Sequence, residues 1–414
     1  MRHRTICILA GALAASCGSA TVQGLATDSG VLDESPTDAG PARDAPPADT
    51  PPTVVAHADA SDGGAHVVDL AVGDSSHQCA LMSDGTVRCR GSDYAAAFGI
   101  GIAGHPLEAV EVPGLSGVVQ VVTTRGVTCT RGRDGSVRCW GTNEYGQLGT
   151  GHEGDEMCSW APTPTPCRTR PTRVPGLDDV VGLAAAEFAV CAIRRDGSVW
   201  CWGSATPYLP HGGSPVPVRA MEVADVTALW WRRLGWIARH RDGRYTTVPI
   251  SPELTIPTDA EMGDGYPSDH TCYRLPDTTV RCMGVNANGK VGNGRSAGPG
   301  GVAAPVDPGL TGVRSIAMGA YHTCAVLDDR TVRCWGDGSY GGLGFDAREQ
   351  CAGLNRPTMC ATTPTRVPGV EQVERVFPGV WGTCVLRVDH EVWCWGTLAG
   401  LIQNATSTPR RAVW

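Results

Sequence analysis

The chain has 414 residues, of which 54 are glycine and 30 are proline, while charged residues make up only 18%. This composition suits short strands joined by tight turns, and the 42 acidic against 34 basic residues exclude the basic excess typical of nucleic-acid-binding proteins. Eighteen cysteines are too many for a reduced cytosol and indicate an oxidising compartment.

Residues 1–17 have the pattern of an export signal. Arg2 and Arg4 precede an apolar run, too short to span a membrane, which ends in small residues at Cys17. The end of this segment, LAASC, resembles a bacterial lipoprotein signal, so we expect Cys17 to be lipidated and to hold the chain at a membrane by its acyl chains. Because the leucine stands one residue further from the cysteine than usual, cleavage after Ala20 is the alternative.

Residues 18–64 are rich in Pro, Ala, Asp and Thr and contain few large apolar side chains. Such a segment cannot bury enough surface to offset the entropy of ordering, so we predict a disordered tether. Gly18, directly after the cysteine, resembles lipoproteins sent to an outer membrane. We therefore expect an exported protein of the cell envelope, at the outer membrane or cell surface, with a secreted or periplasmic protein as the alternative.

Residues 65–414 contain a repeat built around two cysteines ten residues apart. A typical copy reads HTCAVLDDRTVRCWG, at 322–336, and a seventh copy, IARHRDGRYTT, carries Ile237 and Thr247 in the cysteine positions. A period of roughly 35 to 60 residues is typical of repeat architectures. The six cysteine pairs are Cys79 and Cys89, Cys129 and Cys139, Cys191 and Cys201, Cys272 and Cys282, Cys324 and Cys334, and Cys384 and Cys394.

Each copy has the pattern of four short strands. An opening run such as VRSIAMG leads into HTCAVL, a turn and VRCWG, and a glycine-rich turn such as YGGLG precedes a closing stretch such as TPTRVPG. Four short strands separated by turns form one blade of a propeller. We predict an all-β, seven-bladed β-propeller of four-stranded blades, and we expect the C-terminal strand STPRRAVW to complete the first blade and close the ring.

The turn between the two cysteines explains their spacing. We take GRDGS at 132–136 as a three-residue hairpin loop with Gly135 in the left-handed conformation. Counting outward from this loop places Cys129 directly opposite Cys139, in a non-hydrogen-bonded pair with Cα atoms about 4.5 Å apart, at the short end of the range for a disulfide. Other copies have Thr278, Arg330 or His390 in the place of the glycine.

Two more cysteine pairs, Cys158 with Cys167 and Cys351 with Cys360, lie in long inserts after the glycine-rich turns of the second and sixth units. We expect all eight pairs to form disulfides, with buried free thiols as the alternative. Together with the two cysteines of residues 1–17, these pairs account for every cysteine, so no odd thiol remains for nucleophilic catalysis.

The motif set HTCAVL, VRCWG and YGGLG resembles regulator of chromosome condensation repeats over residues 66–414. The resemblance is closest in the second and sixth units and weakest in the fourth. It implies a seven-bladed propeller; the eukaryotic namesake of the family is a guanine-nucleotide exchange factor, whereas a secreted bacterial propeller of this repeat family inhibits β-lactamases. The cysteine pairs depart from the intracellular relatives and agree with export.

Two kinds of segment resemble cofactor-binding or metal-binding motifs. The glycines at 99–104 and 149–154 match the dinucleotide pattern G-x-G-x-x-G, but both segments fall in the glycine-rich turn with no βαβ unit around them. The loop HEGDEMC at 152–158 holds metal-binding types of side chain, yet adjacent loop residues rarely converge on one ion and Cys158 has a predicted disulfide partner. We therefore predict no cofactor and no metal site.

Histidines and tryptophans recur at fixed places in the repeat. A position that is repeated in several blades indicates packing and hydrogen bonding and not one catalytic base, so we predict that the protein is not an enzyme. The recurring residues are His77, His270 and His322 in one place and Trp140, Trp202, Trp335 and Trp395 in another.

The fourth unit departs from the repeat with LWWRRLGW at 229–236. Trp and Arg are common in binding hot spots, and loops on rigid scaffolds carry function. We expect a monomeric, non-catalytic scaffold that binds a protein or glycan; a degenerate blade that packs with these side chains is the alternative reading. A secreted inhibitor of an extracellular enzyme and nucleotide exchange on a small GTPase are the rival functions, and export disfavours the second. The predicted partner-binding residues are Trp160, Trp230, Trp231, Arg232, Arg233 and Trp236.

Overall fold

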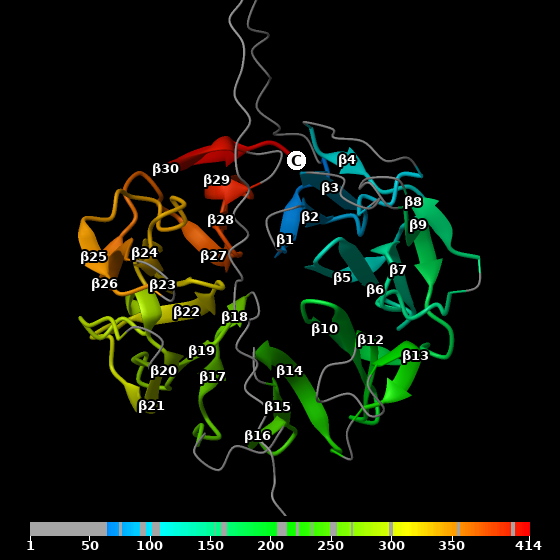
Figure 1. Ribbon diagram of the computed structural model, residues 1–414, viewed down its shortest axis with the longest axis horizontal. Coiled ribbons are helices and arrows are strands. Elements are labelled where there is room, and N and C mark those ends of the chain that lie inside the picture. Colours follow the sequence, from blue (N-terminus) through cyan, green and yellow to red (C-terminus); the bar gives the residue numbers. More distant parts are fainter. Residues whose placement is uncertain are drawn as a thin grey trace, which may run out of the picture. The chain divides into compact units, whose positions relative to one another are not determined.

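Seven β-sheets form a ring, and the innermost strand of each sheet faces the centre (Figure 1). This arrangement confirms the predicted all-β, seven-bladed propeller, and no described segment forms a helix long and apolar enough to cross a membrane. The predicted signal at 1–17, its Cys17 and all of the tether except residue 64 lie outside the described residues. The computed structural model describes residues 64–73, 77–91, 97–101, 108–152, 154–158, 164–204, 213–220, 223–232, 235–248, 255–265, 268–297, 301–353, 357–398 and 402–414.

The blades follow one another around the ring in chain order. The strands of the first blade are β1 (Val67–Val72), β2 (His77–Met82), β3 (Val87–Gly91) and β4 (Val110–Glu111). Those of the second are β5 (Val118–Thr124), β6 (Val127–Gly132), β7 (Val137–Thr142), β8 (Glu156–Cys158) and β9 (Thr165–Arg173). The third contains β10 (Val180–Ala185), β11 (Ala189–Arg194), β12 (Val199–Ser204) and β13 (Gly213–Arg219), and the fourth contains β14 (Val226–Arg232), β15 (Gly235–His240) and β16 (Tyr245–Val248).

The remaining blades include one split inner strand. In the fifth blade β17 pairs with β19, whereas β18 pairs in parallel with β22 of the sixth blade. The strands of the fifth blade are β17 (Glu261–Met262), β18 (Asp264–Gly265), β19 (His270–Arg274), β20 (Val280–Val285) and β21 (Gly301–Val306), with a short 3-10 helix, η3 (Ala287–Gly289). The sixth contains β22 (Val313–Met318), β23 (His322–Leu327), β24 (Val332–Asp337), β25 (Glu349–Cys351) and β26 (Thr358–Arg366), and the seventh contains β27 (Val373–Pro378), β28 (Gly382–Arg387), β29 (Val392–Leu398) and β30 (Ile402–Ala412).

The hairpins between the second and third strands have the predicted geometry. Gly132 N donates to Ser136 O at 2.9 Å, and Gly135 has a φ of 81°. Cys129 therefore lies directly opposite Cys139. The residues that replace the glycine in other blades also adopt a positive φ: Thr278 (66°), Arg330 (59°) and His390 (65°).

Each of the six cysteine pairs with ten-residue spacing forms a disulfide across the second and third strands of a single blade. Their Cα atoms are 4.0 to 4.2 Å apart, slightly closer than the expected separation of about 4.5 Å. In the fourth blade, Ile237 lies opposite Thr247 in the place of such a pair. The disulfides join Cys79 to Cys89, Cys129 to Cys139, Cys191 to Cys201, Cys272 to Cys282, Cys324 to Cys334, and Cys384 to Cys394.

The last strand completes the seventh blade and not the first, so our expectation for ring closure was wrong. β30 pairs with β29, and the first blade has its own outer strand, β4, which pairs with β3. The connection from β29 to β30 is short, and pairing two strands across a short loop loses less chain entropy than pairing the ends of the chain.

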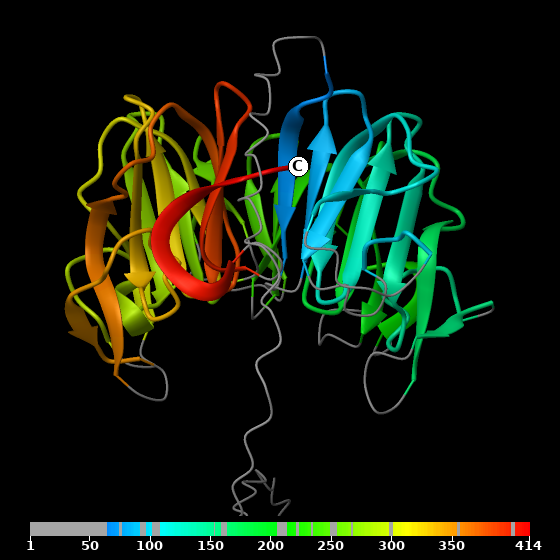
Figure 2. The same cartoon turned by 90° about the horizontal axis from the view of Figure 1, so that it is seen from above.

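The ring closes through side chains of the seventh and first blades. Leu70 of β1 belongs to one buried apolar cluster with Leu386 of β28. Arg90 Nη1 donates to Val413 O at 2.8 Å, and its guanidinium lies 5.5 Å from the centroid of the Trp414 ring. The side view in Figure 2 shows the C-terminal segment beside the first blade. Closure therefore rests on packing and on a cation contact.

Candidate functional site

The recurring histidines form links between neighbouring blades. His322 Nε2 lies 2.7 Å from Thr383 Oγ1 of the next blade, and Thr383 donates in turn to Gly342 O at 2.8 Å. The same carbonyl accepts the ring N–H of Trp395, also at 2.8 Å. Because the threonine hydroxyl donates to the carbonyl, the histidine ring donates to the threonine. His77 and Thr128, and His270 and Thr323, repeat this link, with His–Thr distances of 2.9 and 2.7 Å.

One of these links has the composition of a catalytic triad. Asp269 Oδ1 lies 3.8 Å from His270 Nδ1, and His270 Nε2 lies 2.7 Å from Thr323 Oγ1. Thr323, however, is 0% exposed, and its hydroxyl donates to Lys290 O. Burial lowers the pKa of His270 to about 4 and that of His322 to about 3, which keeps both rings neutral. The links therefore serve packing, as the sequence predicts.

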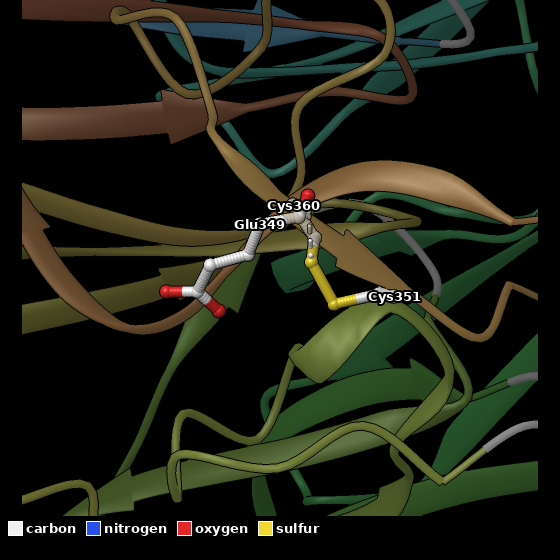
Figure 3. A group of neighbouring side chains, drawn as sticks. All are labelled: Glu349, Cys351 and Cys360. Atoms are coloured by element: carbon white, nitrogen blue, oxygen red, sulfur yellow. Dashed lines mark hydrogen bonds between the residues drawn. A yellow bond between two sulfur atoms is a disulfide. The ribbon is translucent and has the colours of Figure 1, made fainter.

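A cluster of Glu349, Cys351 and Cys360 has metal-ligand types of atom in close proximity (Figure 3). The two sulfur atoms are joined to each other, and a disulfide sulfur is not the thiolate that binds metals. Glu349 Oε2 accepts hydrogen bonds from the backbone N and the hydroxyl of Thr362, at 3.1 and 2.6 Å. These atoms therefore fasten a hairpin and do not form a metal centre.

In the acidic loop of the second blade, Asp155 also contacts side chains of its own blade. The Asp155 carboxylate accepts from Arg168 Nε at 2.9 Å and from Asn143 Nδ2 at 2.7 Å, and His152 Nδ1 lies 3.3 Å from it. Glu153 lies outside the described residues. Asp155 is therefore held by neighbouring side chains of the same blade.

The inserts of the second and sixth blades form two matching hairpins on the outer edge of the ring, which we call the rim hairpins (156–158 with 165–169, and 349–351 with 358–362). β8 pairs with β9, and β25 pairs with β26. Each hairpin is closed by a disulfide, Cys158–Cys167 or Cys351–Cys360, with Cα atoms 5.9 Å apart. Met157 is 61% exposed and Met359 is 42% exposed. Trp160 lies outside the described residues.

The fourth blade contributes its unusual residues to the central channel, which contains a cavity of about 560 Å³. β14 places Trp230, Trp231 and Arg232 in the lining. Trp236, in contrast, is 1% exposed and lies in the core between the third and fourth blades, so our prediction that it contacts a partner was wrong. The innermost strand of each blade runs beside the channel, so its side chains can line it. Side chains of the second strand, such as that of Trp236, are buried between neighbouring sheets. Arg233 lies outside the described residues.

The channel lining is charged. Arg375 Nη1 lies 2.8 Å from Asp69 Oδ1, and Trp230 Nε1 donates to Asp264 Oδ1 at 3.2 Å. Burial raises the pKa of Asp69 above its usual range, although Arg375 opposes this shift. Burial likewise lowers the pKa of Arg232 to about 10. Sequence reasoning identified the tryptophans and Arg232, but Asp69, Asp264 and Arg375 stand in ordinary strand positions, and only the ring brings them together.

Comparison with known proteins agrees with the fold. The regulator of chromosome condensation (RCC1) repeat matches residues 134–193 and 313–341. The mitochondrial RCC1 domain-containing protein RUG3 of Arabidopsis thaliana is 26% identical over 310 residues, which are 64% of this chain and 62% of that protein. The ultraviolet-B receptor UVR8 of the same plant is 24% identical over 288 residues, 68% of this chain and 56% of the receptor. The chain thus spans less than two thirds of either relative.

Among solved structures, Prp20p from Saccharomyces cerevisiae is 18% identical with a TM-score of 0.49, over 84% of this chain and 77% of the yeast chain. The matched repeats lie where the sequence motifs are clearest. The first extends from the hairpin of the second blade to β11, and the second extends over β22, β23 and β24.

Proposed function

We propose that this propeller, two segments of which match the RCC1 repeat, is a non-catalytic binding scaffold that is exported and tethered to a membrane by a lipidated Cys17. The observation that carries the proposal is the pair of rim hairpins, which interrupt the repeat at two places with the same disulfide-closed structure. A rigid scaffold with disulfide-closed hairpins on its outer edge is suited to recognition of a protein.

The rim hairpins combine rigidity with an exposed apolar surface. A disulfide and a threonine–glutamate hydrogen bond hold each one, Thr169 to Glu156 at 2.7 Å and Thr362 to Glu349 at 2.6 Å. Methionine adapts to irregular surfaces, so Met157 and Met359 suit contact with a partner. β8 and β25 are also the outermost strands of their sheets, and an outer edge can pair with a strand of another protein.

Export and tethering rest on the cysteines and on the first 64 residues. Disulfides are stable in oxidising compartments, and sixteen cysteines are joined in eight pairs. A tether over residues 18–64 would have a root-mean-square span of roughly 35–40 Å as a random coil. The rim could then reach a neighbouring protein while Cys17 stays in the membrane.

The rim proposal is tested by substitution of the two methionines in the full-length protein. We expect Met157→Glu and Met359→Glu together to abolish capture of the proteins that the wild type retains from membrane extracts of its source. Val388→Glu, at another exposed apolar side chain on a repeat hairpin, is the matched control and should capture as the wild type does. Equal capture by all three proteins would exclude the rim hairpins as the binding surface.

A further inference from the structure

The cavity in the channel is lined by three guanidinium groups and two carboxylates. Arg375 is paired with Asp69. Arg131 Nε donates to the neutral side chain of Gln120 at 3.3 Å. The ionised groups therefore leave a positive excess in a confined space, which favours an anionic molecule.

Arg232 is the least satisfied of these cations. Its Nε and Nη2 atoms are buried and have no hydrogen-bond partner among the described residues. Its Nη1 atom lies 3.5 Å from Trp231 O, at the outer limit of a hydrogen bond. Asp264 acts on Arg232 through its charge, but one of its oxygens accepts the Trp230 N–H instead. Leaving a buried donor without a hydrogen-bond partner is unfavourable, so an acceptor at this place would be favoured.

Trp230 and Trp231, which precede Arg232 on β14, also line the cavity, and their rings are held in fixed orientations. Trp231 packs edge-to-face on the buried Trp236, with ring centroids 4.5 Å apart. Trp230 is held by its hydrogen bond to Asp264 and lies 6.2 Å from the ring of Tyr245. Both tryptophans keep part of their surface exposed. Because strand side chains alternate, Trp230 lies on the same face of the sheet as Arg232, whereas Trp231 lies on the opposite face.

We infer that the channel binds a small molecule that carries one carboxylate on a ring, with the carboxylate on Arg232 and the ring against Trp230. A carboxylate matches the planar fork of a guanidinium and takes two parallel hydrogen bonds from it. The cavity of about 560 Å³ falls within the usual range for small-molecule sites. Sugar acids and aromatic acids share this chemistry. The site is separate from the rim hairpins and does not depend on their role.

The test uses the full-length protein and measures binding by isothermal titration, with intrinsic tryptophan fluorescence as a second signal. The probes are glucuronate and phenylacetate, each compared with a neutral counterpart of the same ring, glucose and 2-phenylethanol. We expect at least one acid to bind and to change the fluorescence, and its neutral counterpart to bind at least about tenfold more weakly, the factor that corresponds to one lost charged contact. Which acid binds identifies the sugar or the aromatic class. Absence of binding by both acids overturns the inference.

Variants assign the effect to Arg232. Arg232→Gln should weaken binding of the acid at least about tenfold. Arg232→Lys keeps the positive charge but loses the planar guanidinium, so its affinity should lie between those of the wild type and the Gln variant. Arg244→Gln, an exposed arginine of the same blade, is the control and should bind as the wild type does. Because Arg232→Gln removes unsatisfied buried donors, we also expect no loss of thermal stability. Unchanged binding by the Gln variant would refute the site, as would equal weakening by the Arg244 control.

Discussion

Single residues link three pairs of neighbouring blades through hydrogen bonds that no solvent reaches. His322 donates to Thr383, and both Thr383 and Trp395 donate to Gly342 O. The ring of His322 is buried, and burial depresses its pKa to about 3. A protonated ring carries a charge, and burying that charge away from water is unfavourable. The histidine in this link is therefore neutral. Stability therefore depends on pH at this position.

Acidification should weaken the propeller through its buried histidines. The folded-state pKa of about 3 for His322 lies below the unfolded value of about 6.5, so the unfolded chain binds more protons between these values. Stability is then full above about pH 6.5 and falls toward pH 3, by up to about 1.4 kcal/mol per pH unit for each such histidine. Urea unfolding at pH 7.5 and 4.5 should show a smaller pH effect in His322→Gln than in the wild type. His152→Gln, at a half-exposed ring, should keep the wild-type pH effect; an equal effect in all three proteins would contradict the assignment.

At the scale of the element, the hairpin between the second and third strands is the unit that repeats most faithfully. Its aspartate accepts from the backbone two residues further on, as Asp134 does from Ser136 N at 3.0 Å and Asp329 from Thr331 N at 3.0 Å. Hydrogen bonds from the hydroxyls of Ser136 and Thr331, together with these backbone ones, hold the pKa of both carboxyls below the usual range. The aspartate fixes the turn, which allows Arg330 to occupy the left-handed position that favours glycine.

Substitution at this position should change stability in opposite directions in two blades. Arg330 has a positive φ of 59°, a conformation that is strained for residues other than glycine. Arg330→Gly removes this strain and should raise the free energy of unfolding by about 0.5–1 kcal/mol. Gly135→Ala should lower it by at least about 1 kcal/mol, because φ is 81° and a Cβ atom would lie 2.7 Å from Asp178 O. Chemical denaturation measures both. A loss of stability in Arg330→Gly would show that the arginine side chain makes a stabilising contact.

The two kinds of disulfide should have different consequences when removed. Replacing Cys324 and Cys334 by Ala removes a bridge in the centre of a blade and should lower the free energy of unfolding by about 2–3 kcal/mol. Replacing Cys158 and Cys167 by Ala affects an outer hairpin, so partner capture should fall with a much smaller change in the melting temperature. Differential scanning calorimetry and the capture assay, performed on both variants, separate these effects. Equal losses of melting temperature would contradict the distinction.

At the scale of the whole molecule, the junction between the seventh and first blades lacks the histidine–threonine link that joins the first blade to the second, the fifth to the sixth and the sixth to the seventh. Gly382 stands in the place of the linking histidine, Gln78 in the place of the threonine, and Arg90 in the place of the tryptophan. The Gln78 amide has no hydrogen-bond partner among the described residues. At this junction Arg90 contacts Val413 and Trp414 instead, and Arg375 and Asp69 form an ion pair on the channel side.

Loss of the Arg90 contacts should weaken the ring at this junction. Arg90→Met removes a buried cation and its hydrogen bond to Val413 O, and we expect a loss of about 2 kcal/mol in the free energy of unfolding. Hydrogen exchange should then quicken first in β1 and β28. Arg138→Met, on an exposed side chain of β7, is the control and should have little effect. Uniform exchange around the ring in Arg90→Met would contradict a weak junction.

The proposed lipid anchor is tested on the whole chain. The wild type should partition into detergent, and Cys17→Ala should remain in the aqueous phase or accumulate as an uncleaved precursor, because acyl chains are the proposed means of attachment. Phase partitioning followed by mass spectrometry of the N-terminus distinguishes these forms. A wild type that stays wholly aqueous and begins after Ala20 would replace the tethered scaffold by a freely secreted propeller.

The parts of the fold that the sequence predicts are those set by local geometry. Turn length and strand alternation place Cys129 opposite Cys139, and the recurrence of this pattern determines the number of blades. Closure of the ring depends on contacts between residues far apart in the chain, such as Arg90 and Val413, for which the sequence has no local signal. The same holds for the channel, where Asp69 meets Arg375 only once seven inner strands converge.

Among the described residues, every disulfide joins two cysteines that follow one another along the chain, 9 or 10 residues apart. For an exported chain, the next thiol to emerge from the translocation pore is then always the native partner. Oxidation can keep pace with translocation, one hairpin at a time, without the slow reshuffling that mispaired thiols require. The chain should therefore need little help from a disulfide isomerase. The slow step in forming the ring is then the docking of the first blade against the last.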